Sequence, residues 1–331
     1  MMRDENIEQL FDEVRTGSRR ALARALSLVE STTPSDRESA FELLELCTTV
    51  KKTSRRVGLT GSPGVGKSTL VESLGLLLVE SGSQVAVLAV DPSSKRSGGS
   101  ILGDKVRMPR LSLHPHAFIR PSPSKLALGG AATTTRDSIA VCEAAGYDTV
   151  LVETVGVGQS EIEVASIVDL FLLLVLPTAG DDVQGIKRGI MEVAHAILVT
   201  KSDIDSQATN VAVATYSSAL RLMMPSQEGW ETPVLSVCAT QNNGLDGVLE
   251  VMERFFDDGR RTHIDEARKL QRTEWFNLAL QNELFSTLLQ STQGSEFMKL
   301  LKQQVIDNGL PPSVAVHRLV SHFIITIKER S

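Results

Sequence analysis

The N-terminal part of the chain carries apolar residues at helical spacing and shows no strand pattern. A first stripe runs from Ile7 to Val14, with apolar side chains at positions i, i+3, i+4 and i+7 of one helix face. A second apolar stripe follows. The run Thr-Pro-Ser-Asp at 33–36 then predicts the start of a third helix, with threonine at the cap and proline in the first turn. We expect residues 1–50 to form a helical extension without catalytic chemistry.

From about Lys51 the pattern changes to short apolar runs that alternate with helical segments. This alternation is typical of an α/β domain, here expected over residues 51–257, with a mostly parallel sheet covered by helices on both faces. Ligands bind such sheets at the carboxyl ends of the strands, so the residues after each strand are the first candidates for function. The expected strands are 56–60, 85–90, 117–120, 148–153, 170–176, 196–200 and 233–237.

The alternation stops near residue 257, and the rest of the chain reads as helical. Apolar stripes at 275–289 and 300–306 precede a third at 314–327, which follows two prolines. We expect residues 258–331 to be a C-terminal helical region, whose apolar faces cover either the core or a second subunit.

Composition and charge argue against several classes of function. The chain has 331 residues and a net charge of −6, so it lacks the basic footprint of a nucleic-acid-binding protein. No apolar run approaches the ~20 residues that span a membrane. The N-terminus resembles neither a signal peptide nor a transit peptide. Cys47, Cys142 and Cys238 have no metal-binding spacing and read as reduced core residues. These features predict a cytoplasmic protein (mitochondrial matrix if the source is a eukaryote) with no nucleic-acid or membrane partner.

The strongest motif is Gly-Ser-Pro-Gly-Val-Gly-Lys-Ser at 61–68, which matches G-x-x-x-x-G-K-[ST] in full. It lies between an expected strand and a helical segment, where backbone N–H groups at a helix start can surround a phosphate. Lys67 would reach the β- and γ-phosphates, and the Ser68 hydroxyl would occupy one place on Mg²⁺. A glycine-rich turn without a ligand is the plain alternative. A dinucleotide site is disfavoured because it requires G-x-G-x-x-G and makes no use of the Lys-Ser pair.

Acidic residues near strand ends are the candidate metal ligands. Asp91 ends one expected strand, and Asp104 follows in a long segment rich in glycine and serine. Both are either ligands of Mg²⁺ or its water shell, or solvated loop acids. Glu153 follows four apolar strand residues, as does the second metal-site carboxylate of nucleotide hydrolases. Behind it, the Gly156 amide fits a sensor of the γ-phosphate, and Gln159 either orients water or is a polar residue at a helix start.

Two further strand ends carry candidate residues. The strand at 170–176 leads into a charged, glycine-containing loop in which Asp181 and Lys187 are candidates for a catalytic or partner-sensing role. The strand at 196–200 leads into Thr-Lys-Ser-Asp, which resembles the guanine-reading N-K-x-D element. Asp203 would accept the guanine N1–H and N2–H, and the stem of Lys201 would lie over the base.

Two substitutions distinguish these guanine-reading segments. Thr200 stands where asparagine is usual, which removes an amide that braces the base and the phosphate loop. Cys238 replaces serine in a Ser-Ala pair that backs guanine through a backbone N–H, a contact that cysteine retains.

The candidate site residues fall into three groups. The candidate catalytic residues are Lys67, Glu153, Gln159, Asp181 and Lys187; the metal ligands are Ser68, Asp91, Asp104 and Glu153; the nucleotide-binding residues are Gly61, Ser62, Pro63, Gly64, Val65, Gly66, Lys67, Ser68, Thr69, Gly156, Lys201, Asp203, Cys238 and Ala239.

The chain resembles the MeaB/ArgK family of P-loop GTPases over most of its length, including both helical ends. The resemblance is carried by GSPGVGKST at 61–69, AVDPSS at 89–94, GGSILGDK at 98–105, VETVGVGQSE at 152–161 and GDDVQGIK at 180–187. It implies slow hydrolysis of GTP to GDP with Mg²⁺. It also implies a chaperone that gates cofactor loading and protection of an adenosylcobalamin-dependent acyl-CoA mutase of the methylmalonyl-CoA mutase type, and a homodimer held by the C-terminal helices.

Two other classes share the phosphate-binding loop. A small-molecule kinase or ATPase linked to amino-acid transport would have an acceptor pocket in place of a partner surface. A metal-delivery GTPase would need Cys or His clusters near its switch loops, and the sequence shows none.

Overall fold

The computed structural model describes residues 6–31, 33–91, 108–123, 130–154, 160–177, 188–223, 227, 229–290 and 292–328. The chain divides into two compact units, residues 1–271 and 272–331, and each is taken by itself. Within the described ranges, no helix is both long enough and apolar enough to cross a membrane.

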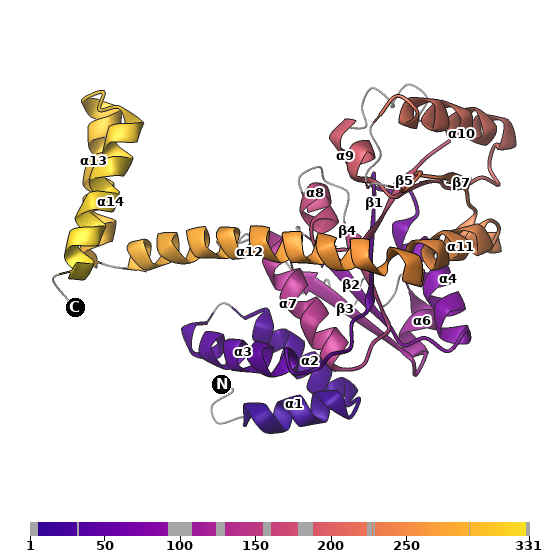
Figure 1. Ribbon diagram of the computed structural model, residues 1–331, viewed down its shortest axis with the longest axis horizontal. Helices are drawn as coiled ribbons and strands as arrows, with labels where there is room; N and C mark the ends of the chain where they lie inside the picture. Colours follow the sequence, from indigo (N-terminus) through magenta and orange to yellow (C-terminus); the bar gives the residue numbers. More distant parts are fainter. Residues whose placement is uncertain are drawn as a thin grey trace. The chain divides into compact units, whose positions relative to one another are not determined.

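The first unit is built around a parallel sheet (Figure 1), as the alternating pattern predicts. The described part of the chain contributes seven strands in the order β3-β2-β4-β1-β5-β6-β7. Because the sheet is parallel, all of its strands end at one edge. The strands are β1 Arg55–Gly61, β2 Val85–Asp91, β3 Ala117–Pro123, β4 Thr149–Thr154, β5 Leu170–Val175, β6 Ala196–Val199 and β7 Val234–Ser236.

Helices cover both faces of this sheet. One face packs against α4 and α6, and the other against α7, α8 and α9 (Figure 1). Strand β1 shows why both faces are apolar. Val57 and Leu59 belong to the core that includes α4, whereas Gly58 faces α8, where a Cβ would stand 2.9 Å from Val168 Cγ2. The helices of this unit are α1 Ile7–Arg15, α2 Arg19–Val29, α3 Pro34–Cys47, α4 Lys67–Glu80, α6 Pro109–Leu113, α7 Gly130–Ala144, α8 Ser160–Ala165, α9 Arg188–Val193, α10 Ser206–Leu220 and α11 Leu245–Phe255, with the short 3₁₀ turns η1 Ala239–Gln241 and η2 Asp258–Arg260.

The N-terminal helices form a layer on α7, as α2 and α3 both contact it. Asn6 and Ser18 cap α1 and α2 by accepting hydrogen bonds from the first turns of these helices. Arg120 on β3 forms an ion pair with Glu30 just after α2, at 2.5 Å. The helical extension is therefore attached to α7 by packing and to the edge strand β3 by an ion pair.

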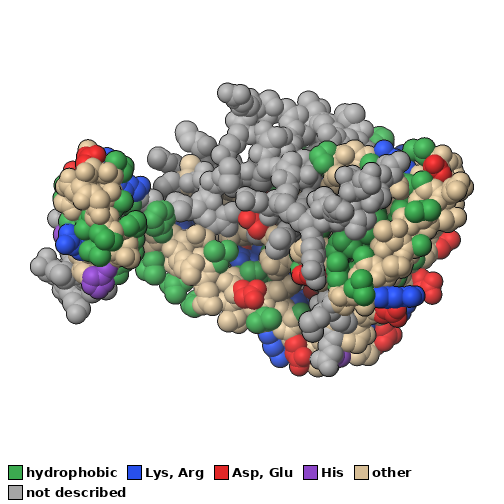
Figure 2. All heavy atoms as spheres, turned by 90° about the horizontal axis from the view of Figure 1, so that it is seen from above, with side chains coloured by type: hydrophobic (Ala, Val, Ile, Leu, Met, Phe, Trp, Pro, Cys, Tyr) green, Lys and Arg blue, Asp and Glu red, His purple; other side chains and the backbone are tan. Residues whose placement is uncertain are grey.

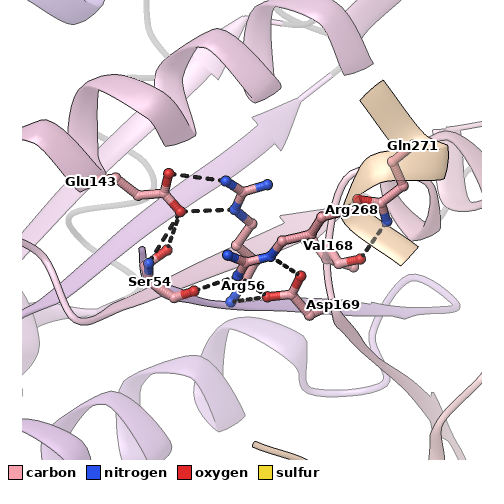
Figure 3. A network of polar contacts seen from close by, with 7 residues as sticks. All are labelled: Ser54, Arg56, Glu143, Val168, Asp169, Arg268 and Gln271. Atoms are coloured by element: carbon pink, nitrogen blue, oxygen red, sulfur yellow. Dashed lines mark hydrogen bonds and ion pairs between the residues drawn. The ribbon is translucent and has the colours of Figure 1, made fainter. Parts of the chain in front are cut away.

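A buried polar network lies at the amino ends of β1 and β5 (Figure 3). Arg268 donates through Nε and Nη2 to the two carboxylate oxygens of Asp169, at 2.7 and 2.5 Å, and also to the Ser54 carbonyl. Arg56 donates its backbone N–H to Asp169 and two guanidinium hydrogens to Glu143 on α7. Because Arg268 lies on α12 (Arg261–Gln290), this network attaches the first part of α12 to the strand that leads into the phosphate loop.

The second unit contains the rest of α12 together with α13 (Thr292–Asp307) and α14 (Pro312–Lys328), which pack against each other. The unit boundary falls inside α12, beyond the position 257 at which the sequence pattern changes, because Arg268 and Gln271 still bond to the first unit. Within the second unit, large apolar side chains are exposed along α12, α13 and α14 (Figure 2). They are Phe276, Leu278, Leu280, Leu284, Phe285, Leu300, Ile306, Val314, Val316 and Val320.

We predict that Arg268→Met destabilises the protein by about 3–5 kcal/mol, because it leaves the carboxylate of Asp169 buried without its charge partner. The matched control is Arg261→Met on the same helix. The Arg261–Asp258 pair spans 3.9 Å with side chains 75% and 98% exposed, so its loss should leave stability unchanged. Urea unfolding followed by circular dichroism measures both. Equal midpoints for the two variants would contradict the structural role given to Arg268.

Candidate nucleotide-binding site

The phosphate loop connects β1 to α4 and is shaped by glycines that no other residue could replace. Gly61 has φ 148°, and a Cβ there would lie 2.4 Å from the Leu174 carbonyl oxygen. Gly66 has φ 103° and is the N-cap of α4. Ser62, Pro63, Gly64 and Thr69 are exposed, so the outer surface of the loop is open to a ligand. The conformation is that of a phosphate-binding loop at a helix N-terminus, as the motif predicts.

Lys67 lies against the loop and is 7% exposed. Its Nζ donates to the carbonyl oxygens of Gly61 at 2.7 Å and Ser62 at 3.0 Å. An ammonium held at the mouth of the loop is placed to meet phosphate oxygens with little rearrangement of its stem.

A candidate Mg²⁺ site lies between the start of α4 and the end of β4. The Ser68 hydroxyl donates to Glu153 Oε1 at 2.7 Å, and Glu153 is buried. Glu153 pairs with Leu59 of β1 on one side and with Ala89 of β2 on the other. A hydroxyl and a carboxylate are hard oxygen donors that suit Mg²⁺, so the residues present fit the ion. Asp91 is the last residue of β2 and pairs with Pro123, at the same edge of the sheet.

The segment after β6 contacts the phosphate loop directly. Thr200 is buried, and its hydroxyl donates to the Val65 carbonyl at 2.7 Å. The asparagine amide is absent, as the sequence shows, but the hydroxyl supplies a link to the phosphate loop at the same position. Lys201 has φ 57°, and Asp203 is exposed. Lys201 and Asp203 are therefore open to a base.

The segment after β7 backs the same region. The Cys238 N–H donates to the Asn243 carbonyl at 2.9 Å, so it is already used inside the protein and the Ala239 amide is the remaining candidate of the pair. The Ala239 carbonyl accepts from the Ser73 hydroxyl on α4 at 2.8 Å. Thus the helix that begins at the phosphate loop is bonded to the segment expected to back guanine.

The described candidates lie at or after the carboxyl ends of β1, β2, β4, β6 and β7, and a direct bond joins Ser68 to Glu153. Outside the described residues lie Asp104, Gly156, Gln159, Asp181 and Lys187.

The motifs did not indicate the hydroxyl residues that connect these parts. Thr60 and Thr154 are both buried, and the Thr154 hydroxyl bonds to that of Thr60 at 3.0 Å between β1 and β4. Thr60 precedes the phosphate loop and Thr154 follows Glu153. The sequence does show a threonine at the end of each of these strands. A hydroxyl buried in a sheet core needs a hydrogen-bond partner, and this requirement was the signal available.

The comparisons with known proteins decide the family. The model of the family described as "Methylmalonyl Co-A mutase-associated GTPase MeaB" matches residues 22–293. The chain belongs to this family. It is 40% identical to the GTPase ArgK of Escherichia coli (strain K12) over 332 residues, covering 98% of this chain and 99% of that protein. It is also 40% identical to the mouse protein named "Methylmalonic aciduria type A homolog, mitochondrial", covering 96% of this chain and 79% of that one.

A solved structure shows the same fold. The crystal structure of a LAO/AO transport system kinase superposes with a TM-score of 0.76 at 33% identity, covering 98% of this chain and 99% of that one. With relatives named as GTPases and a P-loop fold, this MeaB family member is a GTP hydrolase.

We predict that Lys67→Ala weakens GTP binding by roughly 10- to 100-fold or more, because a charge-assisted contact contributes about 1.5–3 kcal/mol. Lys52→Ala is the matched control: Lys52 pairs with Asp148 before β4, at the opposite edge of the sheet. Calorimetry with GDP and GTP measures both variants. Unchanged affinity in Lys67→Ala, with an intact circular dichroism spectrum, would remove the site from this loop.

Proposed function

We propose that this GTPase is a chaperone that gates cofactor loading and protection of an adenosylcobalamin-dependent acyl-CoA mutase, of the methylmalonyl-CoA mutase type. The observation that supports it most is the match over residues 22–293 to a family described as mutase-associated. Three buried free cysteines agree with a reducing compartment such as the cytoplasm.

The hydrolytic step in this proposal is transfer of the γ-phosphoryl group to water, driven mainly by positioning and charge neutralisation. Amides of residues 61–69 and the ammonium of Lys67 hold the phosphates. Ser68 and Glu153 would hold Mg²⁺, and Asp91 and Asp104 would be further ligands of the ion or its waters. Bound there, the ion neutralises charge that develops on the phosphate oxygens.

Other residues would complete the site around the two ends of the nucleotide. The Gly156 amide would sense the γ-phosphate, and Gln159 would orient the attacking water. Asp203 accepts the guanine N–H groups, while the stem of Lys201 covers the base. The Ala239 amide, next to Cys238, completes the base site. Together these contacts favour guanine over adenine nucleotides.

Coupling to the mutase would act through the segment that holds Asp181 and Lys187. This segment follows β5, and β5 is paired with β1 in the sheet, so it leaves the sheet at the edge that carries the phosphate loop. A mutase bound at this edge would bring Lys187 onto the γ-phosphate, much as a partner supplies an arginine finger.

We expect Lys187→Ala to leave intrinsic GTP hydrolysis nearly unchanged and to reduce the mutase-stimulated rate. A cation supplied by a partner accelerates related GTPases by roughly 10³–10⁵, so even a partial loss is measurable. The assay is GTP turnover with and without purified methylmalonyl-CoA mutase, and Lys52→Ala is the control. An equal decrease in both rates would place Lys187 in the resting site and contradict partner gating.

We further propose that the C-terminal helices hold a homodimer. Exposed apolar side chains recur along α12, α13 and α14, among them Phe276 and Ile306, and such side chains favour a partner that covers them. A second copy is the partner we infer.

Truncation after Gln271 should convert the dimer to a monomer, because it removes these side chains and keeps the bonds of Arg268 and Gln271 to the first unit. Light scattering at micromolar concentration measures the mass, with Val211→Glu on α10, an exposed apolar position, as the control. A full chain that is already monomeric would contradict the dimer.

A small-molecule kinase linked to amino-acid transport is the second candidate, and the name of the solved relative favours it. It predicts label from γ-³²P-GTP or γ-³²P-ATP on an amino-acid acceptor, with no dependence on a mutase. Metal delivery has no such support: among described residues, no group of three or more His, Cys, Asp or Glu could hold a metal.

A further inference from the structure

The Val65 carbonyl lies at the most constrained point of the phosphate loop. Val65 is fully buried, and it precedes Gly66, the N-cap of α4. The first helical bond of α4 goes from the Leu70 N–H to the Gly66 carbonyl. Within the described residues, the hydrogen-bond donor to the Val65 carbonyl is the Thr200 hydroxyl, at 2.7 Å. Without that hydroxyl, a buried carbonyl would lose its partner.

The alternative acceptor for the same hydroxyl is weaker. Thr200 Oγ1 lies 3.1 Å from the Val175 carbonyl, but this carbonyl already accepts the Thr200 backbone N–H at 2.9 Å. A hydroxyl has one hydrogen to donate. The shorter contact, to Val65, is therefore the one that the hydrogen satisfies.

This bond fixes the direction of a backbone amide. The peptide group between Val65 and Gly66 is planar and trans, so its C=O and N–H point in opposite directions. With the carbonyl turned toward Thr200, the Gly66 N–H points away from Thr200. Backbone N–H groups hold the phosphates in loops of this type.

We infer that Thr200 is a positioning residue: its hydroxyl holds the Val65–Gly66 peptide so that the Gly66 N–H faces the phosphates. Thr200 itself touches no nucleotide in this arrangement. The inference rests on the proposed placement of the guanine nucleotide at this loop.

The test compares Thr200→Val, which keeps the shape and removes the hydroxyl, with Thr200→Ser, which keeps the hydroxyl. Thr209→Val is the matched control, since Thr209 is also buried and its hydroxyl bonds to the Asp205 carbonyl within α10. Displacement of a fluorescent GDP derivative by GDP and by guanosine gives both affinities. Without the hydroxyl, the Val65–Gly66 peptide is free to turn. Loss of the Gly66 N–H bond to phosphate corresponds to roughly a fivefold or greater loss of GDP affinity.

We expect Thr200→Val to lose about fivefold or more in GDP affinity. Its guanosine affinity should stay the same, because guanosine has no phosphate that could bond to the Gly66 N–H. Thr200→Ser should restore GDP binding, and Thr209→Val should match the unchanged protein. An equal loss for GDP and guanosine, or no loss for either, would overturn the inference. If the unchanged protein fails to bind GDP, the proposed site fails, which is a separate result.

Discussion

The phosphate loop has to keep its N–H groups available for a ligand while every carbonyl that it buries finds a donor inside the protein. In this protein, side chains supply the donors to these carbonyls. Lys67 takes the Gly61 and Ser62 carbonyls, and Thr200 takes the Val65 carbonyl. Positive φ angles at Gly61 and Gly66 turn the chain so that these bonds are possible. Anion binding is thus a consequence of where the carbonyls point.

The parallel sheet brings candidate site residues from distant parts of the sequence to the same edge. Strand β1 lies between β4 and β5, with Glu153 at the end of β4 and the segment that contains Asp181 and Lys187 after β5. The hydroxyl pair of Thr60 and Thr154 then fixes β1 to β4 at the level where the metal ligands begin. A ligand that contacts Ser68 and Glu153 therefore connects the start of α4 to the end of β4, next to strands whose register is set by buried hydrogen bonds.

The sequence predicts the strands, the parallel sheet, the helical ends and the phosphate-loop conformation, because each rests on local spacing and apolar pattern. It does not predict the cross-links. Thr200 bonds to Val65 across 135 positions, and Arg268 bonds to Asp169 across 99. A threonine or an arginine that pairs at such a distance has no local periodicity to reveal it. The sequence also does not reveal that the Cys238 N–H donates to the Asn243 carbonyl, because this bridge forms only in the folded chain.

Strand β1 has bonded neighbours at both of its ends. Its carboxyl end carries the phosphate loop, and beside its amino end Ser54 and Arg56 join Glu143, Asp169 and Arg268 in a buried network. Breaking such a network costs several kcal/mol, so it resists separation of β1 from the first part of α12. Strand β1 is therefore held in place at the end opposite the phosphate loop. The coupling that we propose through Asp181 and Lys187 would act against this fixed strand.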